Sequence, residues 1–218
     1  MRITYGPLET LPYSIDTTPA DINPGCPAPD DFTDEPNADG SRSISIAGPA
    51  GSAGLSKRTL SIADALSLGL YNFEFSYDIN PDANAALFAQ VYETDPVIVD
   101  QNGIVYIKGS SQYNLAEGGE FDIGGWTPTG IKTAIPCGVW TTVIEKFGIN
   151  PATQTLVWQS IQGIAVPASI TTFQGNTGMG WTPYSQFVLQ IQNCLASKPG
   201  IYSRNMRNIY LTCSDMPL

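Results

Sequence analysis

The stretch LYNFEFSYDI, residues 70–79, alternates between apolar and polar side chains from its second residue onward. The apolar positions are Tyr71, Phe73, Phe75, Tyr77 and Ile79. The polar positions are Asn72, Glu74, Ser76 and Asp78. Because successive side chains of a strand point to opposite faces of its sheet, this pattern predicts an antiparallel strand with one buried and one solvated face.

Further strands are predicted on both sides of this stretch, and turn residues separate them. The predicted strands are AALFAQVY (85–92), GIVYIKG (103–109), VWTTVIEKFGI (139–149), TQTLVWQ (153–159), QFVLQIQN (186–193) and MRNIYLTC (206–213). Only SIADALSL (61–68) has the spacing of a helix. The pattern predicts an all-β protein, a two-sheet antiparallel jelly-roll sandwich that occupies residues 58–218.

Residues 1–57 have a different composition, with an N-terminal strand followed by a region rich in proline and acid. Between residues 6 and 41 there are several prolines, no base and many acids: Glu9, Asp16, Asp21, Asp30, Asp31, Asp34, Glu35 and Asp39. Proline lacks the backbone donor that a helix or a central strand requires. We therefore expect an irregular acidic N-terminal arm that is a solvated loop, a calcium-binding loop or a contact to a neighbouring subunit.

The composition excludes several functions. The chain of 218 residues has 20 acidic and 10 basic residues, a net charge of −10 and no histidine. A general nucleic-acid binder needs clustered Lys and Arg, so no nucleic-acid partner is expected. Without histidine, Ser-His-Asp catalysis and His-ligated zinc are excluded. No apolar run is long enough to cross a bilayer, and the N-terminus lacks the apolar region of a secretory signal, so no membrane insertion is expected.

The four cysteines are Cys26, Cys137, Cys194 and Cys213. Their spacing contains no C-x-x-C pair, which argues against a zinc ribbon or a redox motif. We expect reduced, structural cysteines, and the alternative is a Cys194–Cys213 disulfide.

Residues 58–214 resemble the concanavalin A-like superfamily, which includes laminin G domains, legume lectins and glycanases. The resemblance is carried by YNFEFSYDINPDANAALFAQVYE, PCGVWTTVIEKFGINPATQTLVWQSIQG, FVLQIQN and NIYLTC. Gly138, Trp140 and Val143 match the G-x-W-x-x-V strand of that superfamily. The resemblance implies a jelly-roll fold, which hosts lectins, lyases, hydrolases and viral surface domains.

Two segments are candidates for catalysis. GGEFDIGGW (118–126) resembles the E-x-D-x-x-E strand of laminarinase-type glycoside hydrolases, with Glu120 as nucleophile and Asp122 as the charge-tuning acid. The third position, an acid in that family, is Gly125, so leaving-group protonation has no donor. The alternative for this pair is a solvent-facing position on an edge strand. YIKGSSQYN (106–114) resembles the catalytic strand of alginate lyases, in which Tyr106 would act as base or acid.

Aromatic and acidic side chains in turns suggest binding sites. Trp126, Trp181 and Tyr184 lie in loops rich in Gly, Pro and Thr, where they would stack on sugars or close the ends of the core. Trp140 and Trp158 are expected in core strands. In DINPDAN, the side chains of Asp78, Asp82 and Asn84 would chelate calcium or stabilise their own turn.

These observations lead to three classes of function. The first is a non-enzymatic structural or recognition module on a particle surface, such as a phage capsid decoration or tail protein, with neighbouring structural subunits or further copies of the chain as partners. The second is a secreted or virion-borne lectin that binds surface glycans. The third is a polysaccharide lyase or glycoside hydrolase. The first class is the leading expectation, and it places the protein in a virion or outside the cell.

Overall fold

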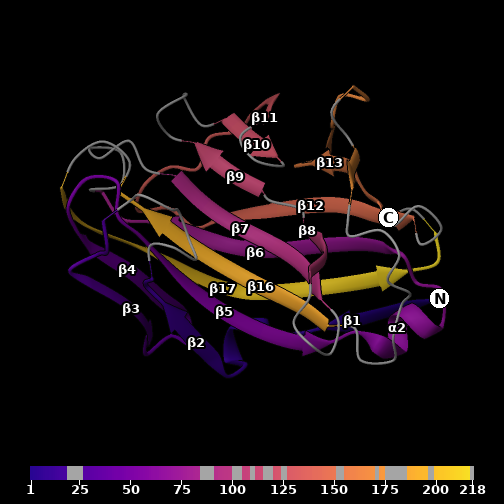
Figure 1. The fold of residues 1–218 in the computed structure, drawn as a ribbon, viewed down its shortest axis with the longest axis horizontal. Helices are drawn as coiled ribbons and strands as arrows, with labels where there is room; N and C mark the ends of the chain where they lie inside the picture. The colour runs from indigo at the N-terminus through magenta and orange to yellow at the C-terminus, as the bar shows by residue number, and fades with distance from the viewer. Residues whose placement is uncertain are drawn as a thin grey trace.

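The computed structural model describes residues 1–18, 27–83, 91–99, 105–108, 111–114, 120–123, 127–150, 155–169, 172–174, 186–195 and 199–216. In these residues the chain forms two antiparallel sheets that pack against each other (Figure 1). The predicted all-β sandwich is therefore confirmed. One short helix, α2 (Ala63–Ser67), lies within the segment that has helical spacing, and a 3₁₀ turn, η1 (Leu8–Thr10), follows the first strand.

The first sheet contains nine strands of the described residues. Its order is β14 (Ile164–Ala165), β13 (Thr155–Ile161), β12 (Thr141–Asn150), β6 (Asn72–Pro81), β17 (Gly200–Ser214), β4 (Arg42–Gly48) and β3 (Asp31–Pro36). In addition, β1 (Arg2–Tyr5) pairs with β17, and β15 (Thr172–Gln174) pairs with β13. We call this sheet A.

The second sheet contains eight strands of the described residues. Its order is β11 (Thr127–Lys132), β10 (Glu120–Ile123), β9 (Ser111–Asn114), β7 (Val91–Val99), β16 (Gln186–Cys194), β5 (Ala53–Ser61) and β2 (Tyr13–Asp16). The remaining strand, β8 (Val105–Lys108), pairs with β7. We call this sheet B.

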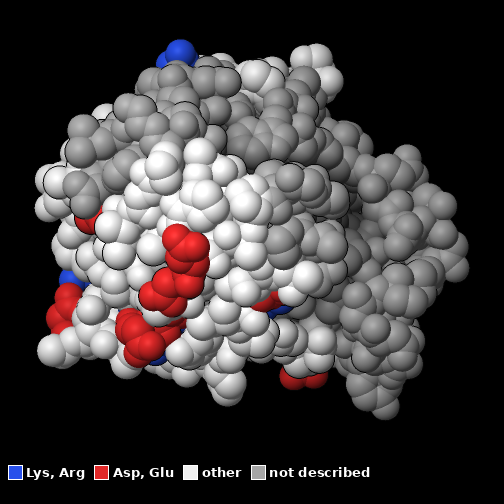
Figure 2. Space-filling view, turned by 60° about the vertical axis from the view of Figure 1, so that its left-hand side comes forward, with Lys and Arg blue, Asp and Glu red and all other residues white. Residues whose placement is uncertain are grey.

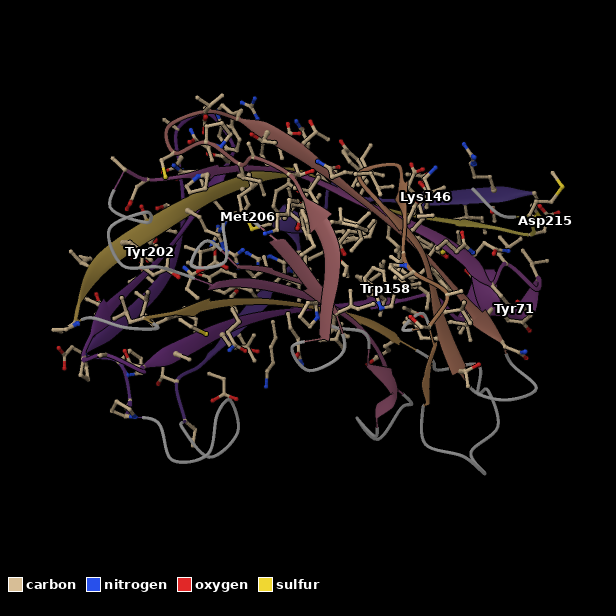
Figure 3. All side chains as sticks on the ribbon, turned by 90° about the horizontal axis from the view of Figure 1, so that it is seen from above. Tyr71, Lys146, Trp158, Tyr202, Met206 and Asp215 are labelled. Carbon is tan, nitrogen blue, oxygen red and sulfur yellow. The ribbon has the colours of Figure 1, made fainter. Side chains whose placement is uncertain are left out.

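The core lies between the two sheets, and the alternating apolar residues of β6 contribute one side of it. Phe73, Phe75, Tyr77 and Ile79 are buried, whereas Tyr71 lies just before β6 and packs against the core half-buried. Phe75 of sheet A approaches Phe187 of sheet B with ring centroids 5.9 Å apart. Met206 and Trp158 also lie between the two layers (Figure 3). The polar positions of β6 consequently face outward on sheet A, where they are available to build a surface site.

The N-terminal region contradicts the expectation of an irregular arm in its described part. It contributes β2 to one border of sheet B and β3 to one border of sheet A. Proline is tolerated in a border strand because such a strand has one row of backbone N–H groups that pairs with no other strand. Pro36 is the last residue of β3. The domain boundary expected between residues 57 and 58 lies inside β5 (Ala53–Ser61).

Three of the four cysteines are described, and Cys137, Cys194 and Cys213 are free thiols. Cys194 lies on β16 and Cys213 on β17, in different sheets, and the Cys194–Cys213 disulfide that was the sequence alternative is not formed. Cys26 lies outside the described residues. In the part of the chain that the structure describes, no helix is long and apolar enough to span a bilayer.

Candidate functional site

A hollow of about 390 Å³ opens on the outer face of sheet A. Four segments of the chain meet there: the β3–β4 turn, the end of β6, the residue before β12 and the first half of β17. The lining side chains are Asn37, Ala38, Asp39, Ser41, Asn80, Trp140 and Asn205. Asn80 and Asn205 are directly opposite each other in the β6–β17 register. Asn80 follows the buried Ile79 and Asn205 precedes the buried Met206, so both asparagines lie on the outer face.

The β3–β4 turn forms one wall of the hollow and is closed by its own hydrogen bonds. The Asn37 N–H donates to the Ser41 carbonyl at 2.8 Å, and the Gly40 N–H donates to the Asn37 carbonyl at 3.1 Å. Gly40 has a φ of 84°, which glycine adopts without strain. The Asn37 side-chain amide donates to Asn205 Oδ1 at 3.1 Å and to Ser41 Oγ at 2.9 Å. The turn is thereby tied to β17.

Asp39 lies exposed at the tip of this turn. Its Oδ1 accepts hydrogen bonds from the Ser41 hydroxyl at 2.6 Å and from the Ser41 N–H at 3.0 Å. The Ser41 hydroxyl and backbone bonds, with a smaller contribution from the positive charge of Arg207, lower the pKa of Asp39 below its usual value. Asp39 is therefore a negatively charged acceptor at neutral pH.

Trp140 forms the opposite wall, which corrects the expectation that it lies in a core strand. It lies just before β12 and is half-buried. The preceding turn contains Gly138, which has a φ of 75° and whose N–H donates to the Pro81 carbonyl at 2.7 Å. This turn holds the indole at the outer face, and the Arg207 guanidinium lies 4.0 Å from the ring centroid. Trp158, by contrast, is buried as expected.

Asp78 forms an ion pair with Arg207 on the outer face of sheet A. Its Oδ1 accepts from the Thr142 hydroxyl at 2.7 Å, and its Oδ2 accepts from the Asn208 amide at 2.8 Å and pairs with Arg207 Nε at 3.5 Å. Burial raises the pKa of Asp78, but the hydrogen bonds from Thr142, Asn208 and Arg207 outweigh it and lower the pKa overall. Arg207 thus contacts both neighbours beside the hollow: it pairs with the Asp78 carboxylate and lies against the Trp140 ring.

The residues proposed for calcium do not fit one ion. The five residues from Asp78 to Asp82 are almost wholly extended, so the two Cα atoms are four steps or about 13 Å apart, which is too far for two carboxylates to share one Ca²⁺ at ~2.4 Å. Each carboxylate instead accepts hydrogen bonds, and Asp82 Oδ2 takes the hydroxyl of Ser203 at 3.1 Å. Asn84 lies outside the described residues. Across the described ranges, no three His, Cys, Asp or Glu side chains are grouped in a way that would hold a metal ion.

The candidate catalytic residues lie on the other sheet. Glu120 and Asp122 lie on β10, which pairs with β9 on one side and β11 on the other and is therefore not an edge strand. Tyr106 lies on β8, which pairs with β7 and not with β10. The structure does not bring Tyr106 onto a strand adjacent to Glu120. The loop aromatics Trp126, Trp181 and Tyr184 lie outside the described residues.

Sequence reasoning missed most residues of the hollow. Asn37 and Asn205 belong to no recognised motif, Asn80 lies in DINPDAN but is not a predicted site residue, and Arg207 is the one base of the predicted strand 206–213. Only the polar face of β6 gave a signal, because Asp78 alternates with its apolar residues. That signal places one residue beside the hollow and not its partners.

Figure 2 brings forward the side that carries β3 and β4, and among the described residues on this face it shows several acidic side chains and few basic ones on a mostly uncharged surface. Such a surface suits an uncharged ligand better than a polyanion.

No protein-family model matches the chain, and no curated protein sequence matches it significantly. Solved structures with a similar fold include arcelin-5, a lectin-like defense protein from Phaseolus vulgaris, at 8% identity and a TM-score of 0.49, with 98% of this chain and 97% of arcelin covered. Lectin I from Ulex europaeus has 8% identity and a TM-score of 0.48, with 99% and 98% covered.

A third similar structure is the CBM2 module of an evolved Dit protein from Lactobacillus casei BL23 phage J-1, at 12% identity and a TM-score of 0.48, with 94% of this chain and 91% of that chain covered. The similarity to these proteins concerns the fold alone. The two-sheet antiparallel sandwich itself is shown by the strand pairing of this chain.

Proposed function

We propose that this chain is a non-enzymatic recognition module that binds glycans in the hollow beside Trp140. One observation carries the proposal: an indole ring faces three carboxamides, one hydroxyl and one carboxylate around a space of about 390 Å³. Sugar hydroxyls both donate and accept hydrogen bonds, and carboxamides supply both groups. An aromatic ring supplies a flat apolar surface for the C–H face of a sugar ring.

The hollow has the size and free polar groups that this role requires. Small-ligand sites measure about 300–1,000 Å³, and the hollow falls within that range. Among the described residues, the Asn80 side chain has no hydrogen-bond partner. The Asn205 amide uses its oxygen for Asn37, and its nitrogen remains available for a ligand. A ligand hydroxyl therefore meets unsatisfied groups.

The site is also held in place before a ligand arrives. Arg207 covers one face of the Trp140 ring, and the Asn37–Asn205 bond fixes the opposite wall. A site that is already ordered loses little conformational entropy on binding, which favours affinity.

The test is a binding assay against a panel of neutral and acidic glycans, followed by Trp140→Ala. We expect binding to at least one neutral glycan and a loss of at least about tenfold in affinity for the variant, since removing an aromatic anchor costs more than 1 kcal/mol. Val139→Ala is the matched control, because Val139 is exposed, adjacent to Trp140 and outside the lining. Equal affinity of Trp140→Ala and the wild type would refute the assignment of the site.

We further propose that the module works on the surface of a particle such as a phage virion, next to structural subunits or other copies of the chain. The supporting feature is β2, the last strand of sheet B among the described residues, on which Tyr13 and Ile15 are 39% and 44% exposed. Border strands carry unpaired backbone groups that a neighbouring chain can pair with. Sedimentation velocity is expected to show an oligomer that Ile15→Lys dissociates, and a monomer at all concentrations would contradict this role.

A glycan-cleaving enzyme is the alternative. The glycan panel tests it in the same samples, because cleavage produces new chain ends. If such ends appear and Glu120→Gln abolishes them, the strand that contains Glu120 and Asp122 is the active site and the recognition role is wrong.

A further inference from the structure

A β-bulge in β17 lies next to the hollow. Arg207 pairs with Asp78 of β6, but the next pair is Tyr210 with Ser76, so β17 contains one extra residue at this point. Asn208 has a φ of 52° there, in the left-handed region that asparagine tolerates better than most residues. The bulge interrupts the hydrogen bonds between β17 and β6, and its backbone donors need another acceptor.

Glu9 is that acceptor. Its Oε1 accepts from the Asn208 N–H at 2.7 Å, and its Oε2 accepts from the Ile209 N–H at 2.9 Å. The Glu9 side chain is buried, with 6% exposed, and Ile209 is fully buried. Without the carboxylate, a buried N–H would be left without a partner, which costs more than an ordinary hydrogen bond contributes.

The segment that carries Glu9 fits closely over the bulge. Leu8, its neighbour in η1, is buried in the core. A Cβ atom at Gly6 would lie 2.8 Å from the Ile209 carbonyl oxygen and would clash with the Tyr210 ring. Glycine at this position therefore lets the N-terminal segment approach β17 closely enough for Glu9 to reach both amides.

The bulge has a consequence for the hollow. In a regular strand, consecutive residues point to opposite faces. Here consecutive residues Arg207 and Asn208 both bond the same carboxylate oxygen, Asp78 Oδ2. This arrangement requires the irregular backbone at Asn208, and it holds the Arg207 guanidinium against the Trp140 ring.

We propose that Glu9 is a positioning residue for the glycan site: its carboxylate clamps the β17 bulge and thereby fixes Arg207 against Trp140. The ligand in this inference rests on the proposed function. The claim that Glu9 positions Arg207 against Trp140 does not depend on the proposed function, and it is tested without any ligand.

The experiment compares the wild type with Glu9→Gln by NMR, using the Arg207 Nε–H and the Trp140 and Trp158 indole N–H resonances. Gln has one acceptor oxygen and adds a donor that faces the bulge amides, so the clamp is lost while the side-chain volume is retained. We expect the Arg207 and Trp140 resonances to shift and that of Trp158 to stay. Asp16→Asn is the matched control, because Asp16 also accepts a backbone N–H, from Thr18 at 3.0 Å, but lies on sheet B. Unchanged Arg207 and Trp140 resonances in Glu9→Gln would overturn the proposal.

A second pair of variants tests the bulge without altering Glu9. Asn208→Gly and Asn208→Val both remove the amide, but only glycine accepts a positive φ without strain. We expect Asn208→Val to reproduce the Glu9→Gln shifts and Asn208→Gly to give smaller ones. Equal shifts for the two variants would show that the backbone conformation is not what positions Arg207, and the proposal would be wrong.

Glycan affinity completes the test. If the wild type binds a glycan, Glu9→Gln is expected to weaken it about tenfold, and the same change in an Arg207→Ala background is expected to have less than about twofold effect. Equal effects in both backgrounds would overturn the positioning role. If the wild type binds no glycan of the panel, the proposed function fails, and the NMR comparison still decides whether Glu9 positions Arg207 and Trp140.

Discussion

Asp34 of β3 and Arg58 of β5 form an ion pair that joins the two sheets, with 2.6 Å between Oδ2 and Nη2 and both side chains fully buried. The other carboxylate oxygen of Asp34 pairs with Arg42 Nε at 2.7 Å. The Tyr13 ring lies against both guanidinium groups, 4.6 Å from Arg42 and 5.2 Å from Arg58. The border strand β3 of sheet A is thus held to β5 of sheet B by charge, and Tyr13 of β2 packs against the same pair of guanidinium groups.

Removal of this carboxylate is expected to be strongly destabilising. Asp34→Asn leaves the buried guanidinium of Arg58 without a counter-ion, and breaking a buried pair from one side costs about 3–5 kcal/mol. The free energy of unfolding from urea titrations measures the loss. Asp31→Asn, at an exposed position of the same strand, is the control. A loss below about 1 kcal/mol for Asp34→Asn would mean that the pair does not contribute as its burial implies.

The two tryptophans of the described residues are expected to respond differently to truncation. Trp158 is 1% exposed, and Trp158→Ala should lower the free energy of unfolding by about 3–5 kcal/mol, as expected for a large core side chain. Trp140 lies at the surface of sheet A, and Trp140→Ala should cost less than about 1.5 kcal/mol. Chemical denaturation compares them, and equal losses would place Trp140 in the core after all.

Asp78 is expected to make stability depend on pH. Its pKa is lowered in the folded protein, so its ionised form stabilises the fold at pH values above the unfolded pKa of about 4. This contribution is lost as the pH falls through the lower, folded pKa. The difference in unfolding free energy between the wild type and Asp78→Asn should therefore be constant from about pH 7 to 5 and shrink below about pH 4. A difference that grows on acidification would contradict the assigned direction.

Cys213 is expected to be chemically inert in the folded protein. Burial raises the pKa of its thiol to about 12, and the thiolate is the form that reacts with alkylating agents. Iodoacetamide at pH 8 should modify the half-buried Cys137 and Cys194 before Cys213, and peptide mass mapping measures the order. In denaturant without reductant, Cys194 and Cys213 should both be labelled. Protection of both together under those conditions would reveal a disulfide.

The sequence by itself determined the fold class. The alternation in β6 and in β16 places Phe75 and Phe187 in the core, because the side-chain direction in a strand repeats every two residues and depends only on near neighbours in the chain. The same periodicity gave the polar face of β6, and with it one residue beside the hollow, Asp78.

The same logic failed in the N-terminal region. In DFTDEP, Phe32 and Asp34 share the buried face of β3, and a buried aspartate looks like a solvated one in a hydrophobic pattern. Its burial depends on Arg58, 24 residues away on the other sheet. No local sequence pattern indicates such a distant partner. The composition of the segment alone therefore predicted an irregular arm.

Only the tertiary structure shows which residues are brought together to form the site. Asn37 and Asn205 are 168 residues apart in the sequence and bond across the hollow, and Glu9 reaches the β17 bulge across 200 residues. Trp140 belongs to a strand-like stretch, yet the turn at Gly138 sets it on the outer face beside Arg207. Periodicity tells which face of a strand a residue occupies, whereas a binding site depends on which strands become neighbours. That depends on long-range packing, which strand periodicity does not encode.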